Sequence, residues 1–513
     1  IKAYDKWKEK CVKKFDGMWS ICIFDQKKEE IFLSRDPFGE KPLFYYLDNS
    51  KFIFGSEIKY ILKLDAQNSD LKKINFNQID LYLKQGYKFL NKKNHTFFKN
   101  IFKFDSGTYA LLNLNTFRII KKKFLKKKGY DLERPISYKD AVLKTKKLVI
   151  ETLGSRLISD VPIGFYLSGG VDSGSLASIA TKVYNQKITC FSIIDKDQRY
   201  NEEKNVDKVT NDLNCNTIKI NFPQKHDFFE RLDKLVDYHD SPIATPSYYT
   251  HSFIHDEVKK YNIKVLISGL GGDEIFSGYF DHYLMHLKEI EKDKKNYNKN
   301  LDNWKKYILP YIRNKNLRDL NLFKNKKNRK YLECELDENF INKYLKNNQV
   351  IKFTEGNYSR SLIKNRMLNE IFHESVPVIC QEDDLNSMMQ SIENRCPLLN
   401  KKLLKFTMSL PPKMFISNGY NKSLFRDSMQ GILTDDVRLD RKKFGFNASI
   451  NSLVNLKSKR VQSVLNNNKD INEFINVRNF KSLISNNKEF DNNESKFIFN
   501  VFNVISFLEK NPL

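Results

Sequence analysis

From about residue 137 onward, short apolar runs alternate with longer segments that have the composition of helices. The apolar runs predict four strands, at residues 163–167, 188–193, 217–220 and 265–267. Strands that alternate with helices are typical of a parallel sheet covered by helices. The pattern therefore predicts an α/β fold for this part of the chain, with a mainly helical C-terminal part.

The first part of the chain has a different pattern, in which short apolar runs are separated by Gly, Pro, Asp and Asn. It predicts strands at residues 15–25, 31–34, 43–46 and 51–54, and a helix at residues 57–62. The lysine-rich residues 121–129 have the composition of a solvated linker. We therefore predict one domain at residues 1–128 and a second at residues 129–513. Within the second, residues 286–350 are dense in Lys, Asn and Asp and predict a helical insertion with mobile loops.

The strand predicted at residues 163–167 leads directly into Ser-Gly-Gly-Val-Asp-Ser, residues 168–173, and then into a predicted helix. Glycines allow a backbone to approach a ligand closely, and the first N–H groups of a helix have no partners within it. Such a loop can bind the phosphates of a nucleotide. Asp172 is placed to hold the magnesium that accompanies a polyphosphate. No Gly-Lys-Ser/Thr follows, so this is not a Walker loop.

A second loop follows the strand predicted at residues 265–267. Residues 268–279 contain glycines and then Asp273, and they lead into another predicted helix. Loops at the carboxyl ends of parallel strands converge on one ligand site. We therefore expect Asp172 and Asp273 to hold one magnesium–pyrophosphate between them. Farther on, Lys442 and Lys443 are cations that could neutralise a departing pyrophosphate.

Composition excludes several other classes of protein. The seven cysteines have no Cys-x-x-Cys spacing, so a disulfide framework or a zinc site is not expected, and a reducing cytoplasm fits. No segment is long and apolar enough for a membrane span. The formal charge of +26 is spread along the whole chain, so we do not expect a nucleic-acid partner. The expected partners are small molecules, and a homodimer is kept open.

Together these motifs resemble the glutamine-hydrolysing asparagine synthetase family over nearly the whole chain. The matching segments are residues 16–19, 35–43, 55–59, 168–173, 191–193, 200–202, 268–279 and 393–399. The first three are similar to the core of a class II glutaminase domain, and the others to a synthetase domain. The resemblance implies a partial glutaminase domain, an Ntn-hydrolase-like β-sandwich, followed by an ATP-pyrophosphatase domain related to the adenine-nucleotide α-hydrolases.

The resemblance also implies a reaction. A carboxylate attacks the α-phosphorus of ATP to give an acyl-adenylate and pyrophosphate, and ammonia derived from glutamine then displaces AMP to leave an amide. ATP and Mg²⁺ are the implied cofactors. The implied contacts are Leu167, Ile193, Ser268 and Gly269 to the adenosine, Ser168, Gly169, Gly170, Asp172 and Ser173 to pyrophosphate, and Asp172 and Asp273 to Mg²⁺. Lys442 or Lys443 would stabilise the leaving group.

The chain departs from the family at the glutaminase nucleophile. The family uses an N-terminal Cys whose own α-amine serves as base to the thiol. Here the first residue is Ile1, which aligns well inside that domain, so the nucleophile is missing and we expect a natural precursor to carry it. Cys11 and Cys22 lie in or beside a predicted core strand, and we expect both to be buried structural residues.

A second departure is Leu270, because authentic asparagine synthetases carry Glu in that position. A Leu side chain cannot transfer a proton. Asp240-Ser241-Pro242 and residues 382–388 also differ from the commoner family motifs. These differences resemble the branch of the family found with surface-polysaccharide genes, so the acceptor is expected to be either aspartate, as in asparagine synthesis, or a sugar acid.

Two readings of other classes stay open. A tRNA-modifying ATP pyrophosphatase would agree with the positive charge, but such enzymes lack the glutaminase segment at residues 35–43 and use a thiolate pair. An inactive scaffold would agree with the missing nucleophile. Intact Asp172 and Asp273 argue against it, because drift erodes such polar residues early.

Overall fold

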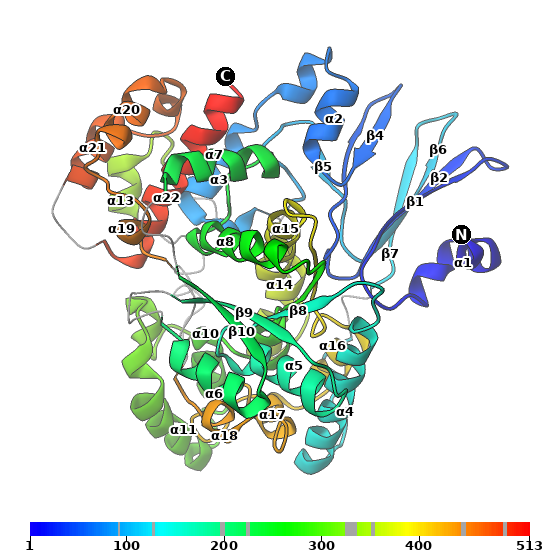
Figure 1. Cartoon of the computed structure of the whole chain (residues 1–513), viewed down its shortest axis with the longest axis vertical. Helices are drawn as coiled ribbons and strands as arrows, with labels where there is room; N and C mark the ends of the chain where they lie inside the picture. The colour runs from blue at the N-terminus through cyan, green and yellow to red at the C-terminus, as the bar shows by residue number, and fades with distance from the viewer. Residues whose placement is uncertain are drawn as a thin grey trace.

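The computed structural model describes residues 1–90, 93–125, 129–194, 201–221, 226–323, 336–349, 354–442, 448–485 and 490–513. In Figure 1 the antiparallel sheets lie at the upper right, and the parallel sheet lies near the middle of the molecule among helices. The mixed α/β architecture predicted from the sequence is confirmed. Within the insertion predicted at residues 286–350, the structure describes helix α11 (Lys294–Tyr307) and helix α13 (Glu338–Tyr344).

The N-terminal part contains two antiparallel sheets. The first has the order β1 (Ser20–Asp25), β2 (Glu30–Arg35), β6 (Thr108–Asn113), β7 (Ile119–Lys123). The second has the order β4 (Phe52–Gly55), β3 (Phe44–Leu47), β5 (Phe102–Lys103). A buried cluster of Leu33, Leu43, Phe104 and Ala110 joins the two sheets, because Leu33 and Ala110 belong to the first sheet and Tyr45, Phe52 and Phe54 of the second pack against the cluster. The predicted helix is α2 (Ile58–Leu64).

Two predictions for this part are wrong. Lys121–Lys123 is not linker, because it forms the end of β7 and pairs with β6, with Lys123 opposite Thr108. Lysines suit this strand, which lies at the edge of its sheet with its side chains exposed. Cys11 is buried as expected, but Cys22 is exposed, because it occupies an outward-facing position of β1. Residues 126–128 of the predicted linker lie outside the described residues.

The rest of the chain contains a five-stranded parallel sheet with the order β10, β9, β8, β11, β12. Its strands are β8 (Ile163–Tyr166), β9 (Thr189–Ile194), β10 (Asn216–Asn221), β11 (Val265–Ile267) and β12 (Glu393–Arg395). Helix α5 (Val171–Lys182) connects β8 to β9, and α6 (Glu203–Leu213) connects β9 to β10. The four predicted strands are therefore confirmed within a residue or two at their ends.

Strand β12 was not predicted, because Glu393-Asn394-Arg395 is short and polar. It pairs with β11, with Val265 opposite Glu393 and Ile267 opposite Arg395. Arg395 is held there because its Nη1 donates to two backbone carbonyls, that of Arg156 at 2.7 Å and that of Ile158 at 2.8 Å. Tertiary pairing, not intrinsic strand preference, makes this segment a strand.

The N-terminal sheets are joined to the rest of the chain by contacts that bury charge. Arg156 Nη2 lies 3.0 Å from Glu40 Oε1, and Lys41 Nζ lies 2.8 Å from Asp384 Oδ1. The C-terminal helix α22 (Asn492–Lys510) begins with a capping box and is buried along most of its length. Asn500 on α22 donates to the carbonyl of Tyr82 at 3.1 Å, which ties the C-terminal helix to α3 (Phe76–Gln85).

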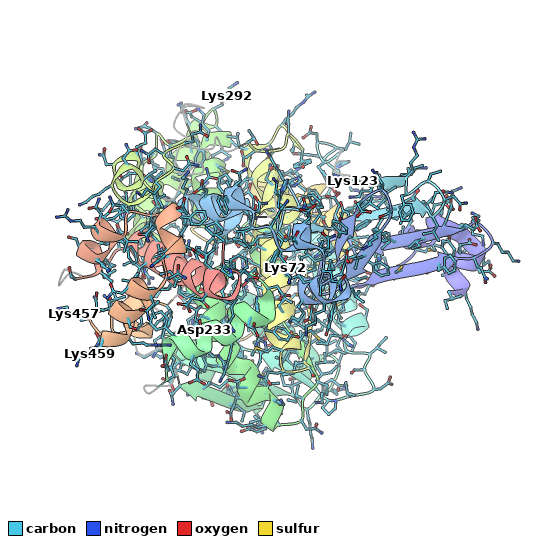
Figure 2. The ribbon with its side chains drawn as sticks, turned by 90° about the horizontal axis from the view of Figure 1, so that it is seen from above. Lys72, Lys123, Asp233, Lys292, Lys457 and Lys459 are labelled. Carbon is cyan, nitrogen blue, oxygen red and sulfur yellow. The ribbon has the colours of Figure 1, made fainter. Side chains whose placement is uncertain are left out.

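The surface carries the positive charge on many elements. In Figure 2 the labelled Lys72, Lys123 and Lys292 project from separate parts of the fold, and Lys457 and Lys459 project together from a fourth. Across the described residues, no helix is long and apolar enough to cross a membrane.

Candidate active site

The loop after β8 has the geometry expected of a phosphate-binding turn. Gly169 has a φ of +70°, and a Cβ added there would lie 3.0 Å from the carbonyl oxygen of Glu202. Gly170 is the N-cap of α5, so the first N–H groups of this 12-residue helix face the loop. The N–H of Ser168 donates to Ser173 Oγ at 3.1 Å, which closes the turn. Only glycine fits position 169 without strain.

The loop after β11 lies directly against the first loop, because β8 and β11 are neighbours in the sheet. It turns through Gly271, which has a φ of +88°, into the short helix α9 (Gly272–Phe276). A Cβ added at Gly272 would lie 2.4 Å from Cγ of Asp172, and one at Gly269 would lie 3.0 Å from its Cβ. The glycines of the second loop therefore leave the space that the Asp172 carboxylate occupies.

Asp172 and Asp273 meet at a side chain that was not predicted. Lys422 Nζ lies 2.5 Å from Asp172 Oδ2 and 2.7 Å from Asp273 Oδ1. Lys422 is 6% exposed, and it has a φ of +53° just before helix α17 (Ser423–Ser428). Its neighbour Asn421 donates to the carbonyl of Gly278 at 2.8 Å, which fixes this turn to the second loop. No motif in the sequence marked Lys422, because its partners are distant in the chain.

The charges at this point define what the site can bind. Burial lowers the pKa of Lys422, but the carboxylates of Asp172 and Asp273 outweigh burial and raise it above its ordinary value. Lys422 therefore stays protonated and neutralises part of the charge of the two carboxylates. Paired carboxylate oxygens are the ligands that Mg²⁺ prefers, and Mg²⁺ is commonly held by one or two of them together with phosphates. These residues fit a magnesium–polyphosphate.

Two adjoining cavities open at the two loops. The larger is about 580 Å³ and the smaller about 230 Å³. Both are lined by Ser168, Asp172 and Asp273, so these three residues stand at the boundary between them. Lys422 and Arg426 line the smaller cavity alone. The smaller chamber thus combines cations with carboxylates, the cations being Lys422, Arg426 and Lys442 and the carboxylates Asp172, Glu202, Asp273 and Asp440.

The residues expected to bind ATP are distributed over these chambers. Those that line the larger cavity are Leu167, Ser168, Asp172, Ser173, Ile193, Ser268, Gly269 and Asp273. Those that line the smaller cavity are Ser168, Gly169, Gly170, Asp172, Asp273 and Lys442. Lys442 is exposed, and its N–H donates to Asp440 Oδ1 at 2.9 Å. Lys443 lies outside the described residues.

Comparison with known proteins decides the family. Residues 144–507 match the family described as asparagine synthase, and residues 1–125 match a glutamine amidotransferase domain. The chain belongs to the asparagine synthase family.

The chain is similar to several asparagine synthetases over different lengths. It is 34% identical over 284 residues to a putative glutamine-hydrolysing asparagine synthetase 2 of Methanocaldococcus jannaschii, a match that covers 55% of this chain and 53% of that protein. It is 27% identical over 460 residues to asparagine synthetase 1 of Bacillus subtilis, covering 87% of this chain and 70% of that protein. The chain thus spans about half the length of the first of these asparagine synthetases and more than two thirds of the second.

Leu270, where the asparagine synthase resemblance leads one to expect Glu, lines the larger cavity. Two pairs of titratable side chains line the same cavity. His251 Nδ1 lies 3.9 Å from Asp383 Oδ1, and Glu274 Oε1 accepts from the hydroxyl of Tyr279 at 2.6 Å. Sequence reasoning did not single out His251 or Asp383 individually. They come from helices far apart in the chain, α8 (Pro246–Lys260) and α15 (Ser375–Met388), so no sequence motif joins them. Their shared position in the cavity wall makes them candidate catalytic residues.

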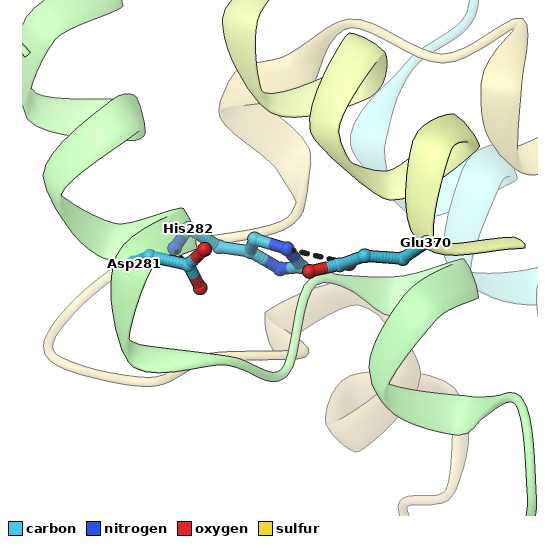
Figure 3. Close-up of side chains that lie close together, drawn as sticks. All are labelled: Asp281, His282 and Glu370. Carbon is cyan, nitrogen blue, oxygen red and sulfur yellow. Dashed lines mark hydrogen bonds and ion pairs between the residues drawn. The ribbon is translucent and has the colours of Figure 1, made fainter. Parts of the chain in front are cut away.

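A third cluster has the spacing of a metal site. Ligand atoms of Asp281, His282 and Glu370 all lie within 4.8 Å of one another, and His282 Nε2 is 2.9 Å from Glu370 Oε2 (Figure 3). Arg366 Nε lies 3.2 Å from Glu370 Oε1 and 3.5 Å from Asp281 Oδ2. Burial lowers the pKa of His282, but Glu370 and Asp281 outweigh it and raise the pKa. Because Arg366 and His282 already pair with these carboxylates, we assign the cluster a structural role.

Proposed function

We propose that the chain catalyses the ATP-dependent amidation of a carboxylate, using ammonia that derives from glutamine. One observation carries the proposal: the two adjoining cavities share Ser168, Asp172 and Asp273. A reaction that splits ATP between its α- and β-phosphates needs AMP on one side of a boundary and pyrophosphate on the other. The larger chamber suits adenosine with the acceptor, and the smaller one suits pyrophosphate.

The residues have distinct roles in this proposal. The loop at residues 168–173 binds pyrophosphate through its N–H and hydroxyl groups. Asp172 and Asp273 hold Mg²⁺, which neutralises phosphate charge when it is bound. Lys422 is buried beside both carboxylates, so its positive charge stabilises the negative charge that develops on the pyrophosphate. Lys442 and, by the family resemblance, Lys443 add positive charge at the open side.

The first step joins the acceptor to AMP. A carboxylate oxygen forms a bond to the α-phosphorus, the bond from that phosphorus to the bridging oxygen breaks, and pyrophosphate leaves with the electron pair. In the second step the ammonia nitrogen forms a bond to the acyl carbon. The bond from that carbon to the AMP oxygen then breaks, one proton leaves the nitrogen, and an amide and AMP are released.

L-Aspartate is the first acceptor we propose, because the similar proteins carry the name asparagine synthetase. A sugar acid is the second, and it is favoured by one observation. Leu270 gives the wall of the larger cavity an apolar side chain where the family resemblance predicts a carboxylate. We also propose that residues 1–128 are the C-terminal portion of a glutaminase domain and that residues 129–513 form the synthetase domain.

The experiment is pyrophosphate release from the chain with Mg-ATP and ammonium, with either L-aspartate or D-glucuronate as acceptor. We expect release that depends on one of the two acceptors and that is abolished in Asp172→Ala. Release that is unchanged in Asp172→Ala would falsify the magnesium assignment. If no pyrophosphate is released with any carboxylate tested, the result would favour an inactive scaffold. Binding to tRNA that weakens steeply with salt would favour a tRNA-modifying enzyme.

A further inference from the structure

The second step of the proposed reaction needs a group to take up a proton. When ammonia attacks the acyl carbon, the new C–N bond leaves a positive charge on nitrogen, and a proton must go before the amide is stable. A positioned base contributes about 10²–10⁴ to such a step. Leu270 cannot serve, although its side chain lines the cavity where the acyl carbon would lie.

The carboxylates and imidazoles that line the larger cavity are few, among the residues that the structure describes. They are Asp172, His251, Asp273, Glu274 and Asp383. Asp172 and Asp273 are committed to Lys422 and, in the proposal, to magnesium. Glu274 is 2% exposed and accepts from Tyr279, which limits its access to the cavity. The pair formed by His251 and Asp383 remains.

His251 and Asp383 have the arrangement of a base and its orienting carboxylate. The His251 side chain is 30% exposed, whereas that of Asp383 is 8% exposed, so the imidazole is the more accessible of the two. The 3.9 Å from Nδ1 to the nearer carboxylate oxygen is longer than a hydrogen bond, and such contacts often tighten when substrate binds. Asp383 is held in turn, because Asn394 Nδ2 donates to Oδ2 at 3.3 Å. A carboxylate beside Nδ1 favours the tautomer with its proton on Nδ1, in which Nε2 is the basic nitrogen.

We propose that His251 takes the proton from the attacking nitrogen, and that Asp383 is its positioning residue. This inference rests on the proposed amidation. The nitrogen-to-carbon bond forms, the proton moves from nitrogen to Nε2 of His251, and AMP leaves with the electron pair of the carbon–oxygen bond. The pair thereby takes the proton-accepting part that Leu270 cannot play.

The test separates the two steps. Acceptor-dependent exchange of labelled pyrophosphate into ATP reports adenylate formation, and amide formation with ammonium reports both steps. The acceptor used is whichever of L-aspartate and D-glucuronate supports pyrophosphate release. In His251→Gln we expect the exchange rate to stay within about twofold of the wild type while amide formation falls about 10²–10⁴-fold. Asp383→Asn should show the same selective loss, whereas a merely structural role would lower both rates together.

The matched control is His95→Gln, because His95 packs on the ring of Phe102 and does not line the cavity. It should change neither rate. Unchanged amide formation in His251→Gln, or an equal loss of both rates, would overturn the inference. A selective loss in Glu274→Gln with none in His251→Gln would assign the proton to Glu274 instead. Absence of exchange in the wild type with both acceptors would contradict the proposed function itself, and the inference would fall with it.

Discussion

Lys422 Nζ lies 2.5 Å from Asp172 Oδ2, although 250 residues separate them in the chain. The same ammonium lies 2.7 Å from Asp273 Oδ1. One buried cation therefore holds together the carboxylates of two loops that follow neighbouring strands. The arrangement holds both carboxylates close together and places a positive charge beside the smaller cavity.

Replacing Lys422 by Met should impair the first step of the reaction. The variant keeps much of the side-chain volume but removes the charge that stabilises a departing pyrophosphate. Removing one such group costs about 10²–10³ in rate, so we expect acceptor-dependent pyrophosphate release to fall by that factor. Lys442→Met is the matched control, since Lys442 lines the same cavity but is exposed, and its loss should be smaller. An effect larger at Lys442 than at Lys422 would contradict this assignment.

A methyl group at Gly272 should damage the site and spare the fold. The added Cβ would lie 2.4 Å from Cγ of Asp172, so the carboxylate must swing away. Displacing a reacting group by about 1 Å can cost about 10²-fold in rate, and we expect Gly272→Ala to lose pyrophosphate release to that extent. The control is Gly55→Ala, because the nearest atom to its added Cβ is 3.5 Å away. Equal activity of the two variants would show that Asp172 need not stand where the structure has it.

Strand positions and loop identities were predictable because their causes are local. The apolar run at residues 265–267 became β11 with the predicted ends, and the glycines at residues 169 and 271 occupy positive φ values. Lys422 could not be found in this way, since only tertiary packing brings it to Asp172. The exposed position of Cys22 depends on which face of β1 meets the core, which the apolar run alone did not decide.

Arg366 should be essential to stability. Its side chain is fully buried, and its Nη1 and Nη2 lie 2.9 Å from Glu355 and 2.5 Å from Glu374. Removing one partner from a buried ion pair costs about 3–5 kcal/mol, so Arg366→Met should lower the urea midpoint of unfolding accordingly. Lys147→Met removes an exposed pair with Glu151 and should cost less than about 1 kcal/mol. Equal midpoints for the two variants would contradict the structural role of the cluster.

Glu382 should make stability depend on pH. Burial raises the pKa of its carboxyl to about 8, although the N–H of Ala244 and Lys103 oppose the shift. The folded state therefore holds this proton to higher pH than the unfolded state does. The stability that the group contributes is present below its unfolded pKa and is lost as pH rises through about 8.

Glu382→Gln removes this titration and leaves an amide oxygen to accept from Ala244. Neighbouring His239, 3.8 Å away, should not mask the change, because burial lowers the pKa of that imidazole to about 3. In urea unfolding at pH 5 and pH 8.5, the free energy of unfolding of the variant, relative to that of the wild type, should be higher at pH 8.5 than at pH 5. A difference between the two proteins that is constant over this range would show that Glu382 titrates normally.

The central claim is that a carboxylate is activated at the α-phosphorus of ATP. The most direct test incubates the chain with Mg-ATP, ammonium and an acceptor labelled with ¹⁸O in its carboxylate. The mass of the nucleotide product is then measured by mass spectrometry. The account predicts that AMP carries one ¹⁸O atom and that amide forms in equal amount. Unlabelled AMP, or ¹⁸O in inorganic phosphate with ADP, would contradict it.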